Sequence, residues 1–455
     1  MTAHRCRRGA ATVEMRMSRE SEQIAGAAGS AAMLRYRYLI FAVLALAYFF
    51  VYFHRLSLSV VADDLARDFD VGAGVLGSLG SIYFYCYALM QLPAGLLSDS
   101  IGPRKTVSSF LVVAAAGSVL FGLAQGITAA FAGRVLVGFG VSMVFIPTMK
   151  ILSQWFRKQE FAFMAGMLNA VGGIGALGAT WLLSAMAAGF GWRVSFQLIG
   201  VLTAAIAVLV WLLVRNRPAD KGWPSIAVVD GGTGRDDPPD GDITLWAGVR
   251  QVLSNRHFWP LALWFFFDAG VFFGFGALWG GPFLMHVYGM TQSEAGFILS
   301  MIAWAMIVVS PLMGFLSDRV LKSRRKPMVF CGLLMVAQFA LLALYPAGFS
   351  RTALLFFFFL FSIAASCIVS IGFTMAKELF PLEIAGTAVG TVNLFPFLGG
   401  AIYQPLLGKV LDAWPRSAAG GYAVEAYGML ILVLLGTSLL ALVCTFFIKE
   451  TFPAD

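Results

Sequence analysis

Charged residues interrupt two of the long apolar segments in this sequence. In AYFFVYFHRLSLSVVADDL, which begins at Ala47, His54 and Arg55 stand between two apolar runs, and Asp268 lies well inside a later one. A guanidinium keeps its proton and matches a carboxylate with two parallel hydrogen bonds, whereas histidine exchanges protons near neutral pH. Arg55 therefore predicts a site for a carboxylate-bearing ligand. We expect His54, Asp268 and Arg134 to act in proton coupling or gating.

Each of these charged residues has a structural alternative. Neighbouring positions on a helix point about 100° apart, so His54 and Arg55 need not face the same cavity. Arg134 equally fits a packing role against the helix that carries Arg55, and a buried ion pair between Arg55 and Asp268 would itself serve as a gate. The predicted substrate-binding set comprises Arg55, Tyr83, Tyr87, Asn169, Trp304, Asn393 and Gln404.

The composition indicates that the elements carrying these residues cross a membrane. Of 455 residues, 59% are hydrophobic and only 12% are charged, about half the charge of soluble domains. Runs of ~20 apolar residues are long enough to cross ~30 Å of hydrocarbon, where only helices or closed barrels satisfy their backbone. We predict an all-α polytopic membrane protein with twelve transmembrane helices, over residues 38–62, 74–98, 105–124, 128–153, 161–187, 193–214, 258–285, 293–316, 327–346, 352–376, 384–410 and 424–448.

Short loops give the predicted orientation. Basic residues, including Arg157, Arg215 and the run RVLKSRRK from Arg319, gather in alternate loops, whereas the loop ADDLARDFD from Ala62 is acidic. Because Lys-rich and Arg-rich loops remain in the cytoplasm, we expect both termini to lie inside, at the cell inner membrane. The net charge of +8 follows from this bias and from an Arg-rich tail, so we expect no nucleic-acid partner.

Linkers and tails divide the chain. We predict a disordered cytoplasmic tail over residues 1–34, six-helix bundles over 35–215 and 257–449, a cytoplasmic linker over 216–256 and a cytoplasmic C-terminus over 450–455. Met33 is a second candidate for the first residue of the protein. The five cysteines have no metal-ligand spacing, and neither a phosphate-binding loop nor an H-E-x-x-H motif occurs. We therefore expect no metal, no cofactor and no enzymatic activity.

The two halves of the sequence resemble each other. At a shift of 219 residues, GSLGSIYFYCYALMQLPAGLLSD from Gly77 aligns with GFILSMIAWAMIVVSPLMGFLSD from Gly296. At a shift of 224 residues, Gly175 aligns with Gly399 in a second, weaker match. Repeated halves are typical of secondary transporters, in which one bundle rocks against the other around a central site. Chance similarity of glycine-rich helices is the alternative for the second match.

The loops that follow these repeats resemble a signature of the major facilitator superfamily. GLLSDSIGPRK from Gly95 and GFLSDRVLKSRRK from Gly314 are similar to its G-x-x-x-D-R/K-x-G-R/K-R/K motif, although Ser100 and Pro103 replace basic residues in the first copy. The resemblance implies a cytoplasmic latch between the halves made by Gly95, Asp99, Gly102, Arg104, Gly314, Asp318 and Arg319. We expect Gly95 to allow close helix packing and Asp99 to accept hydrogen bonds and attract nearby basic residues.

Two groups within that superfamily look similar to this chain. The first half resembles anion:cation symporters for organic and sugar acids, and that resemblance implies that Arg55 contacts a substrate anion. ALWGGPFLMHVYGM from Ala277 and GTVNLFPFLGGAIYQPLLG from Gly390 resemble phagosomal amino-acid transporters. His54 stands where the symporters usually carry an acid, so their proton coupling does not transfer directly.

The expected function is therefore secondary active transport by alternating access, with proton-coupled import of a small carboxylate-bearing solute. The expected partners are an anionic or zwitterionic small molecule, protons and membrane lipid, and we expect a monomer. Two alternatives remain open at this point. One is an exporter or antiporter of a small organic molecule or siderophore, and the other is a non-transporting, transporter-like sensor.

Overall fold

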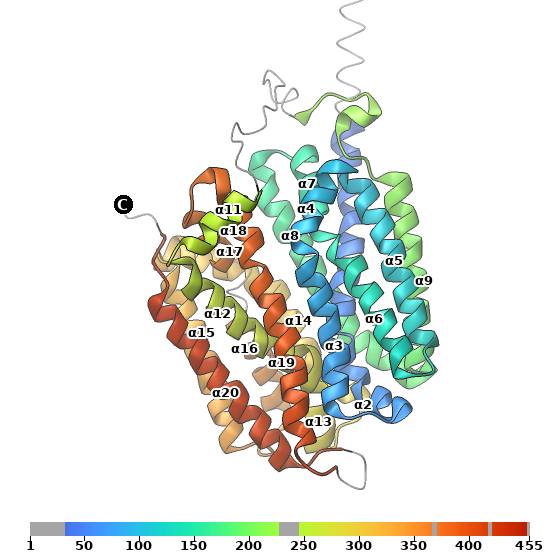
Figure 1. Ribbon diagram of the computed structural model, residues 1–455, viewed down its shortest axis with the longest axis vertical. Coiled ribbons are helices and arrows are strands. Elements are labelled where there is room, and N and C mark those ends of the chain that lie inside the picture. Colours follow the sequence, from blue (N-terminus) through green and yellow to red (C-terminus); the bar gives the residue numbers. More distant parts are fainter. Residues whose placement is uncertain (1–31, 227–244, 366–370, 417–420, 453–455) are drawn as a thin grey trace, which may run out of the picture.

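The computed structural model describes residues 32–226, 245–365, 371–416 and 421–452, and these residues are almost entirely helical (Figure 1). The first half contains an opening helix (Ala32–Leu56), α2 (Leu58–Phe69), α3 (Ala73–Leu89), α4 (Gln91–Ser100), α5 (Pro103–Leu123), α6 (Ile127–Ser142), α7 (Phe145–Trp155), α8 (Lys158–Leu177), the π-helix η1 (Gly178–Leu182) and α9 (Leu183–Leu213). A short 3₁₀ turn, η2 (Pro218–Lys221), follows.

The second half begins after α11 (Leu245–Ser254). It contains α12 (Phe258–Val271), the π-helix η3 (Phe272–Trp279), α13 (Gly280–Tyr288), α14 (Gln292–Phe315), the π-helix η4 (Leu316–Leu321), α15 (Arg325–Leu344), α16 (Arg351–Ala365), α17 (Phe373–Glu378), α18 (Leu382–Val392), α19 (Leu394–Asp412) and α20 (Val424–Phe447). We use "first half" for 32–213 and "second half" for 258–447.

The predicted all-α membrane class is confirmed, and the helix count is consistent with twelve. Within the described ranges, nine helices are long and apolar enough to span a membrane, or ten when the pair formed by α3 and α4, bent by 53°, counts as one span. One of these, Phe163–Leu213, crosses twice, because Gly191 inside it has φ +78°. Trp192 donates to Asp68 at one end of the molecule, and Leu213 accepts from Tyr36 at the other.

The two ends of the molecule differ in their charges. We name the basic end by Arg104, Arg157, Arg215 and Arg324, and the acidic end by Asp63, Asp64, Asp68 and Asp70. The described chain both begins and finishes at the basic end, at the top of Figure 1, where the ring of Phe452 lies 5.2 Å from the guanidinium of Arg324. At the acidic end, hydrogen bonds from Trp192 and Arg193 lower the pKa of Asp68, and they outweigh partial burial, which alone would raise it.

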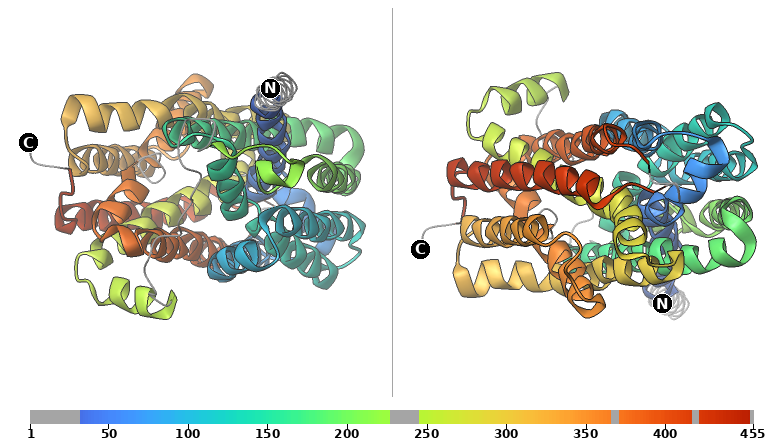
Figure 2. Two further views of the ribbon diagram at one scale, coloured as in Figure 1. Left: turned by 90° about the horizontal axis from the view of Figure 1, so that it is seen from above. Right: turned by 90° about the horizontal axis from the view of Figure 1, so that it is seen from below.

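The two halves lie largely on opposite sides of the molecule, as the end-on views of Figure 2 show. Their closest approach runs along α3 and α19, which lie side by side. At the acidic end, Asp412 of α19 accepts hydrogen bonds from the backbone N–H groups of Ala73 (2.9 Å) and Gly74 (2.7 Å), which begin α3. Arg416 donates to the carbonyl of Val71 at 2.5 Å. A helix N-terminus favours a carboxylate, so these contacts hold the halves together at this end.

Glycines that repeat between the halves occupy equivalent contacts. A Cβ on Gly77 of α3 would lie 2.6 Å from Cα of Pro405 in α19, and a Cβ on Gly296 of α14 would lie 2.7 Å from the carbonyl of Thr180 in η1. Both are contacts between the halves. Glycine allows this backbone approach because it has no side chain.

The glycines of the weaker match, Gly175 and Gly399, also allow close backbone contacts, but between helices of the same half. A Cβ on Gly175 of α8 would clash with the carbonyl of Phe49, and one on Gly399 of α19 would clash with the carbonyl of Phe266 in α12. Each glycine therefore brings two helices of its own half into backbone contact. Chance similarity does not account for such matched contacts.

The expectation that Gly95 allows close helix packing is wrong in this conformation. A Cβ on Gly95 would meet no described atom within 4 Å, whereas one on Gly77 would be forced against α19. The close approach of the span formed by α3 and α4 therefore lies at Gly77, near the acidic end, rather than at the basic-end motif.

This difference predicts opposite effects of two alanine substitutions. Gly77→Ala should lower the unfolding temperature in detergent, because overpacking costs about 1–3 kcal/mol. Gly95→Ala, on the same span, is the matched control and should leave that temperature unchanged or raise it, since alanine favours a helix by up to ~1 kcal/mol. Equal unfolding temperatures for the two variants would contradict the close approach of α3 and α19.

Candidate functional site

Arg55 lies between the two halves, enclosed by four aromatic rings. Its guanidinium carbon is 4.6 Å from the ring centre of Tyr52 and 5.0 Å from that of Tyr87, both in the first half. The rings of Phe397 (5.2 Å) and Phe273 (5.7 Å) face it from the second half. We call these five residues the arginine box. Because both halves contribute, any movement between them changes the surroundings of this cation.

The guanidinium of Arg55 has unused hydrogen-bonding capacity. The residue is only 6% exposed, and its Nε is buried without a hydrogen-bond partner. Within the described ranges, no Asp or Glu oxygen lies within 4.0 Å of it. Contacts with ring faces recover up to ~2 kcal/mol, whereas burying an ion costs several kcal/mol. An anion placed in the box would supply the missing acceptors.

Arg134 and His54 form a separate layer beside the box. Arg134 of α6 is buried, donates to the backbone carbonyl of His54 at 3.2 Å and lies 5.2 Å from the ring of Tyr83. The Tyr83 hydroxyl in turn donates to the carbonyl of Val51 at 3.2 Å. These bonds to carbonyls of the opening helix agree with the packing alternative for Arg134, and the ring of Tyr83, 5.9 Å from that of Tyr87, adjoins the box.

The His54 ring does not share the surroundings of Arg55. It is fully buried, packs against the rings of Phe53 and Phe50, and neither ring nitrogen has a hydrogen-bond partner in the described structure. This follows from their adjacency, because neighbouring helix positions point in different directions. Only Arg55 of the pair faces the box.

Asp268 is not brought to the arginine box. It lies in α12, is 2% exposed, and its Oδ2 has no hydrogen-bond partner. Within the part of the chain that the structure describes, no Lys, Arg or His nitrogen lies within 4.0 Å of its carboxylate. The ion pair between Arg55 and Asp268 that we considered as a gate is therefore absent from this conformation.

Two of the three predicted amides, Asn393 and Asn169, lie next to the arginine box. Asn393 donates to Oε1 of Gln91 at 2.9 Å, and this bond joins the halves one helical turn from the stacked rings of Tyr87 and Phe397. Asn169 accepts a long bond of 3.5 Å from the hydroxyl of Tyr52. Both amides therefore adjoin the arginine box.

The other two predicted residues lie elsewhere. Gln404 is buried and donates to the carbonyl of Phe273 at 3.0 Å, while its own carbonyl accepts from the Trp279 indole at 2.9 Å, so it joins α19 to η3. Trp304 is 46% exposed on the same face of α14 as Phe297 and Val308. Tyr52, Phe273 and Phe397 were missed by the sequence reasoning, and the only available signal was the position of Tyr52 one turn before Arg55.

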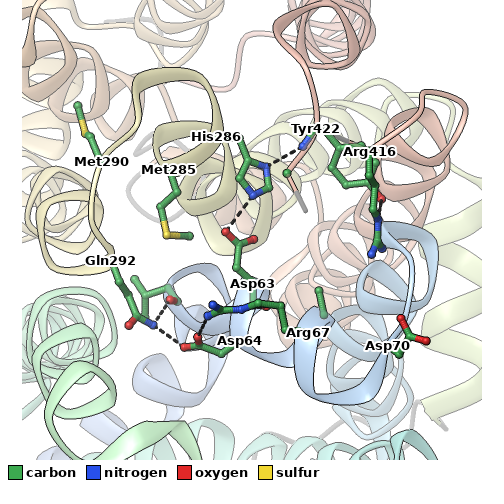
Figure 3. Close-up of a pocket in the computed structure, with 13 residues that line it drawn as sticks. Asp63, Asp64, Arg67, Asp70, Met285, His286, Met290, Gln292, Arg416 and Tyr422 are labelled. Carbon is green, nitrogen blue, oxygen red and sulfur yellow. Dashed lines mark hydrogen bonds and ion pairs between the residues drawn. The ribbon is translucent and has the colours of Figure 1, made fainter. Parts of the chain in front are cut away.

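A cavity of about 640 Å³ lies between the halves at the acidic end (Figure 3). Its polar and charged lining residues are Asp63, Asp64 and Arg67 from α2, Asp70 directly after α2, and His286, Gln292, Arg416 and Tyr422 from the second half. Gln292 donates to Oδ2 of Asp64 at 2.9 Å, and His286 lies 2.9 Å from Asp63. This end of the molecule is therefore joined by polar contacts across the cavity.

The family model described as Major Facilitator Superfamily matches residues 44–403 and, in a second match, residues 269–454. The chain belongs to the major facilitator superfamily. The Membrane sensor protein UhpC of Salmonella typhimurium is 25% identical and covers 88% of this chain and 92% of its own. The Probable galactarate/D-glucarate transporter GarP of Escherichia coli is 24% identical (90% and 94% covered), and the Probable hexose phosphate transport protein of Chlamydia pneumoniae is also 24% identical (83% and 86%).

Solved structures show the same fold. A bacterial homologue of the human lysosomal transporter Spinster superposes with a TM-score of 0.72 at 20% identity, covering 91% of this chain and 96% of that one. The nucleoside transporter NupG superposes with a TM-score of 0.69 at 15% identity, covering 90% and 98%. The relatives and the fold identify a multi-pass protein of a transporter superfamily rather than an enzyme.

The first superfamily motif joins helices within the first half. Asp99 forms an ion pair with Lys150 of α7, which also donates to the carbonyl of Ser98 at 3.2 Å. Arg104 donates to the carbonyl of Trp211 and lies 4.7 Å from its ring. Gly102 has φ +88°, a conformation that glycine adopts without strain. The attraction of Asp99 for a basic residue is thus present, but in this conformation it is internal to one half.

The second motif copy lies partly outside the described side chains, which exclude those of Gly314 and Asp318. Arg319 is exposed on η4. Arg324 pairs with Glu378 at 2.9 Å, and its backbone N–H donates to Glu450 at the same distance. Hydrogen bonds from Ser323 and from backbone N–H groups lower the pKa of Glu450 to about 2, although partial burial alone would raise it.

The isolation of Asp268 predicts that neutralising it stabilises the protein. A buried carboxylate without a cation is unfavourable when ionised, so Asp268→Asn should raise the unfolding temperature in detergent at pH 8. Glu378→Gln is the matched control and should lower it, because the substitution removes the negative charge that pairs with the guanidinium of Arg324. Destabilisation by Asp268→Asn would instead reveal a partner for the carboxylate.

Proposed function

We propose that this protein is a secondary active transporter that imports a small organic anion by alternating access, coupled to protons, across a bacterial inner membrane. The observation that carries this proposal is the arginine box: a buried guanidinium lies between the halves, faced by rings from both of them, without a carboxylate partner in the described structure. Such a cation is suited to bind a carboxylate or phosphate that arrives with the substrate.

The contacts between the halves support alternating access. The bonds of Asp412, Arg416, His286 and Gln292 across the halves gather at the acidic end. If the basic end faces the cytoplasm, as Lys-rich and Arg-rich loops favour, this conformation is closed toward the outside. Separation of these contacts would open the arginine box to the outside. The described chain begins and finishes at the basic end, so both termini would be cytoplasmic in this orientation.

The relatives favour particular anions. Galactarate and D-glucarate carry carboxylates, and hexose phosphates carry a phosphate, according to the names of the transporters that are similar to this chain. A forked guanidinium matches either group. We therefore favour sugar acids and sugar phosphates over amino acids, and import over export of a siderophore or another small organic molecule.

Asp268 supports coupling to protons. Its carboxylate is buried without a cation in the described structure, so the site favours the neutral, protonated carboxyl. Uptake of a proton together with an anion also reduces the net charge that crosses the hydrocarbon. His54 is less suited to this role, because its ring lacks hydrogen-bond partners and is fully enclosed.

A non-transporting sensor is the second candidate, since one relative is named a membrane sensor protein. A sensor would bind the anion in the same box without carrying it across. Purified protein in sealed liposomes separates the two functions, because a transporter accumulates labelled D-glucarate or hexose phosphate when the outside is acidic. Binding without accumulation in either direction would favour the sensor.

The arginine box predicts that substitutions of Arg55 weaken anion binding to different degrees. Charge-assisted hydrogen bonds contribute ~1.5–3 kcal/mol, so Arg55→Lys, which cannot form the two-pronged contact, should weaken binding roughly tenfold or more. Arg55→Ala should nearly abolish binding. The measurement is titration calorimetry and liposome uptake with D-glucarate and with a hexose phosphate as probes.

Arg193→Lys is the control, because this arginine pairs with Asp68 at the acidic end, away from the box. It should bind the probe as the unmodified protein does. Unchanged affinity in Arg55→Ala would remove the substrate role of Arg55 and leave only a packing role.

A further inference from the structure

One histidine bridges the two halves at the acidic end. Nε2 of His286, in α13, lies 2.9 Å from Oδ2 of Asp63 in α2, and Figure 3 shows the two side chains facing each other across the cavity. On the other side of the ring, Nδ1 lies 2.8 Å from the hydroxyl of Tyr427 in α20. The backbone N–H of Tyr422 also points to Nδ1, at 3.4 Å.

These partners determine which nitrogen carries the hydrogen. A carboxylate only accepts, so the Nε2 that faces Asp63 must donate. A backbone N–H only donates, so the Nδ1 that faces Tyr422 carries a lone pair. The arrangement therefore fits a neutral imidazole that is protonated at Nε2 and accepts hydrogen bonds at Nδ1, the nitrogen that can take up a second proton. Because a hydroxyl both donates and accepts, Tyr427 can reverse its hydrogen bond when Nδ1 gains a proton.

A second proton would strengthen the bridge. It converts the hydrogen bond from a neutral imidazole to the Asp63 carboxylate into an ion pair between imidazolium and carboxylate, which adds the attraction of opposite charges. The second proton also removes the long hydrogen bond from the backbone N–H of Tyr422, because Nδ1 can then no longer accept. The gain exists only while the halves meet at this end, because Asp63 and His286 belong to different halves.

The other charged groups around the bridge have partners of their own. Asp64 pairs with Arg67 and accepts from Gln292, and Arg416 donates to the carbonyl of Val71. Asp412 accepts from the Tyr422 hydroxyl at 2.5 Å. Asp70 lines the same cavity. In the described structure, His286 is the basic side chain within 4.0 Å of the Asp63 carboxylate.

We propose that His286 is a proton-binding site of the transport cycle, at which protonation favours closure of the acidic end through Asp63. The cavity of Figure 3 gives a proton access to this site, in contrast to the enclosed ring of His54. The inference rests on the proposed function in one respect, that the halves part at the acidic end. With the acidic end outside, external acid would then promote the step that encloses an imported anion.

The test measures opening of the acidic end as a function of pH, without any substrate. Spin labels on Gln125→Cys and Ala347→Cys, exposed positions on opposite halves near this end, report the separation by pulsed EPR after the five native cysteines have been replaced. Between pH 8 and pH 5.5 the ratio of closed to open molecules in lipid nanodiscs should rise about tenfold, because the ion pair between protonated His286 and Asp63 forms only in the closed arrangement.

His286→Gln should abolish this rise, because its amide still donates to Asp63 but does not titrate. Asp63→Asn should abolish it independently, which keeps the test decisive if one variant fails to fold. Asp68→Asn, on the same helix but paired within its own half, and His257→Gln, at the basic end, should retain the rise.

A flat response in the unmodified labelled protein, or an unchanged rise in His286→Gln, would overturn the proposal. Neither result depends on anion binding. If the Arg55 variants keep their affinity for the anion, the proposed function is contradicted. The role of His286 is then still tested by the spin-label ratios alone.

Discussion

The structure depends on how a guanidinium is held inside a low-dielectric interior without a carboxylate beside it. Ring faces around Arg55 recover part of the lost hydration, and in the function proposed above an incoming anion supplies the remainder. A carboxylate partner such as Asp268 would have satisfied the charge permanently and removed the reason to bind substrate. The absence of that pair from this conformation is therefore consistent with a site that is completed by its ligand.

Two kinds of contact join the halves, and they differ in how easily they separate. Glycines such as Gly77 and Gly296 allow helix backbones to meet, which gives smooth surfaces with many small dispersion contacts. At the acidic end, in contrast, a few polar bonds made by Asp412, Arg416 and His286 are directional and are lost with a small displacement. In the proposed transport cycle, the smooth contacts would permit rocking, and the polar bonds would determine which position is held.

Much of the fold was predictable because hydrocarbon imposes simple rules on sequence. Apolar length predicted membrane-spanning helices, and the repeat predicted two related halves. Site details were less predictable. Arg55 was evident from its cost in a membrane, but Phe273 and Phe397 are indistinguishable from the many other phenylalanines until tertiary packing brings them to it. Gln404 and Trp304 illustrate the converse, since residue type alone does not tell a ligand contact from a helix contact or an exposed face.

Two segments, the opening helix with α2 and η3 with α13, link the arginine box to the contact between His286 and Asp63 at the acidic end. The opening helix carries Arg55 and, after a break at Ser57, α2 carries Asp63; likewise Phe273 lies in the π-helix η3, and His286 follows in α13. π-helical segments and helix breaks can change register at low cost. An anion bound in the box and a proton bound at His286 would thus act on the same two helices. Coupling between substrate and proton then needs no direct contact, only that both favour the same arrangement of these helices.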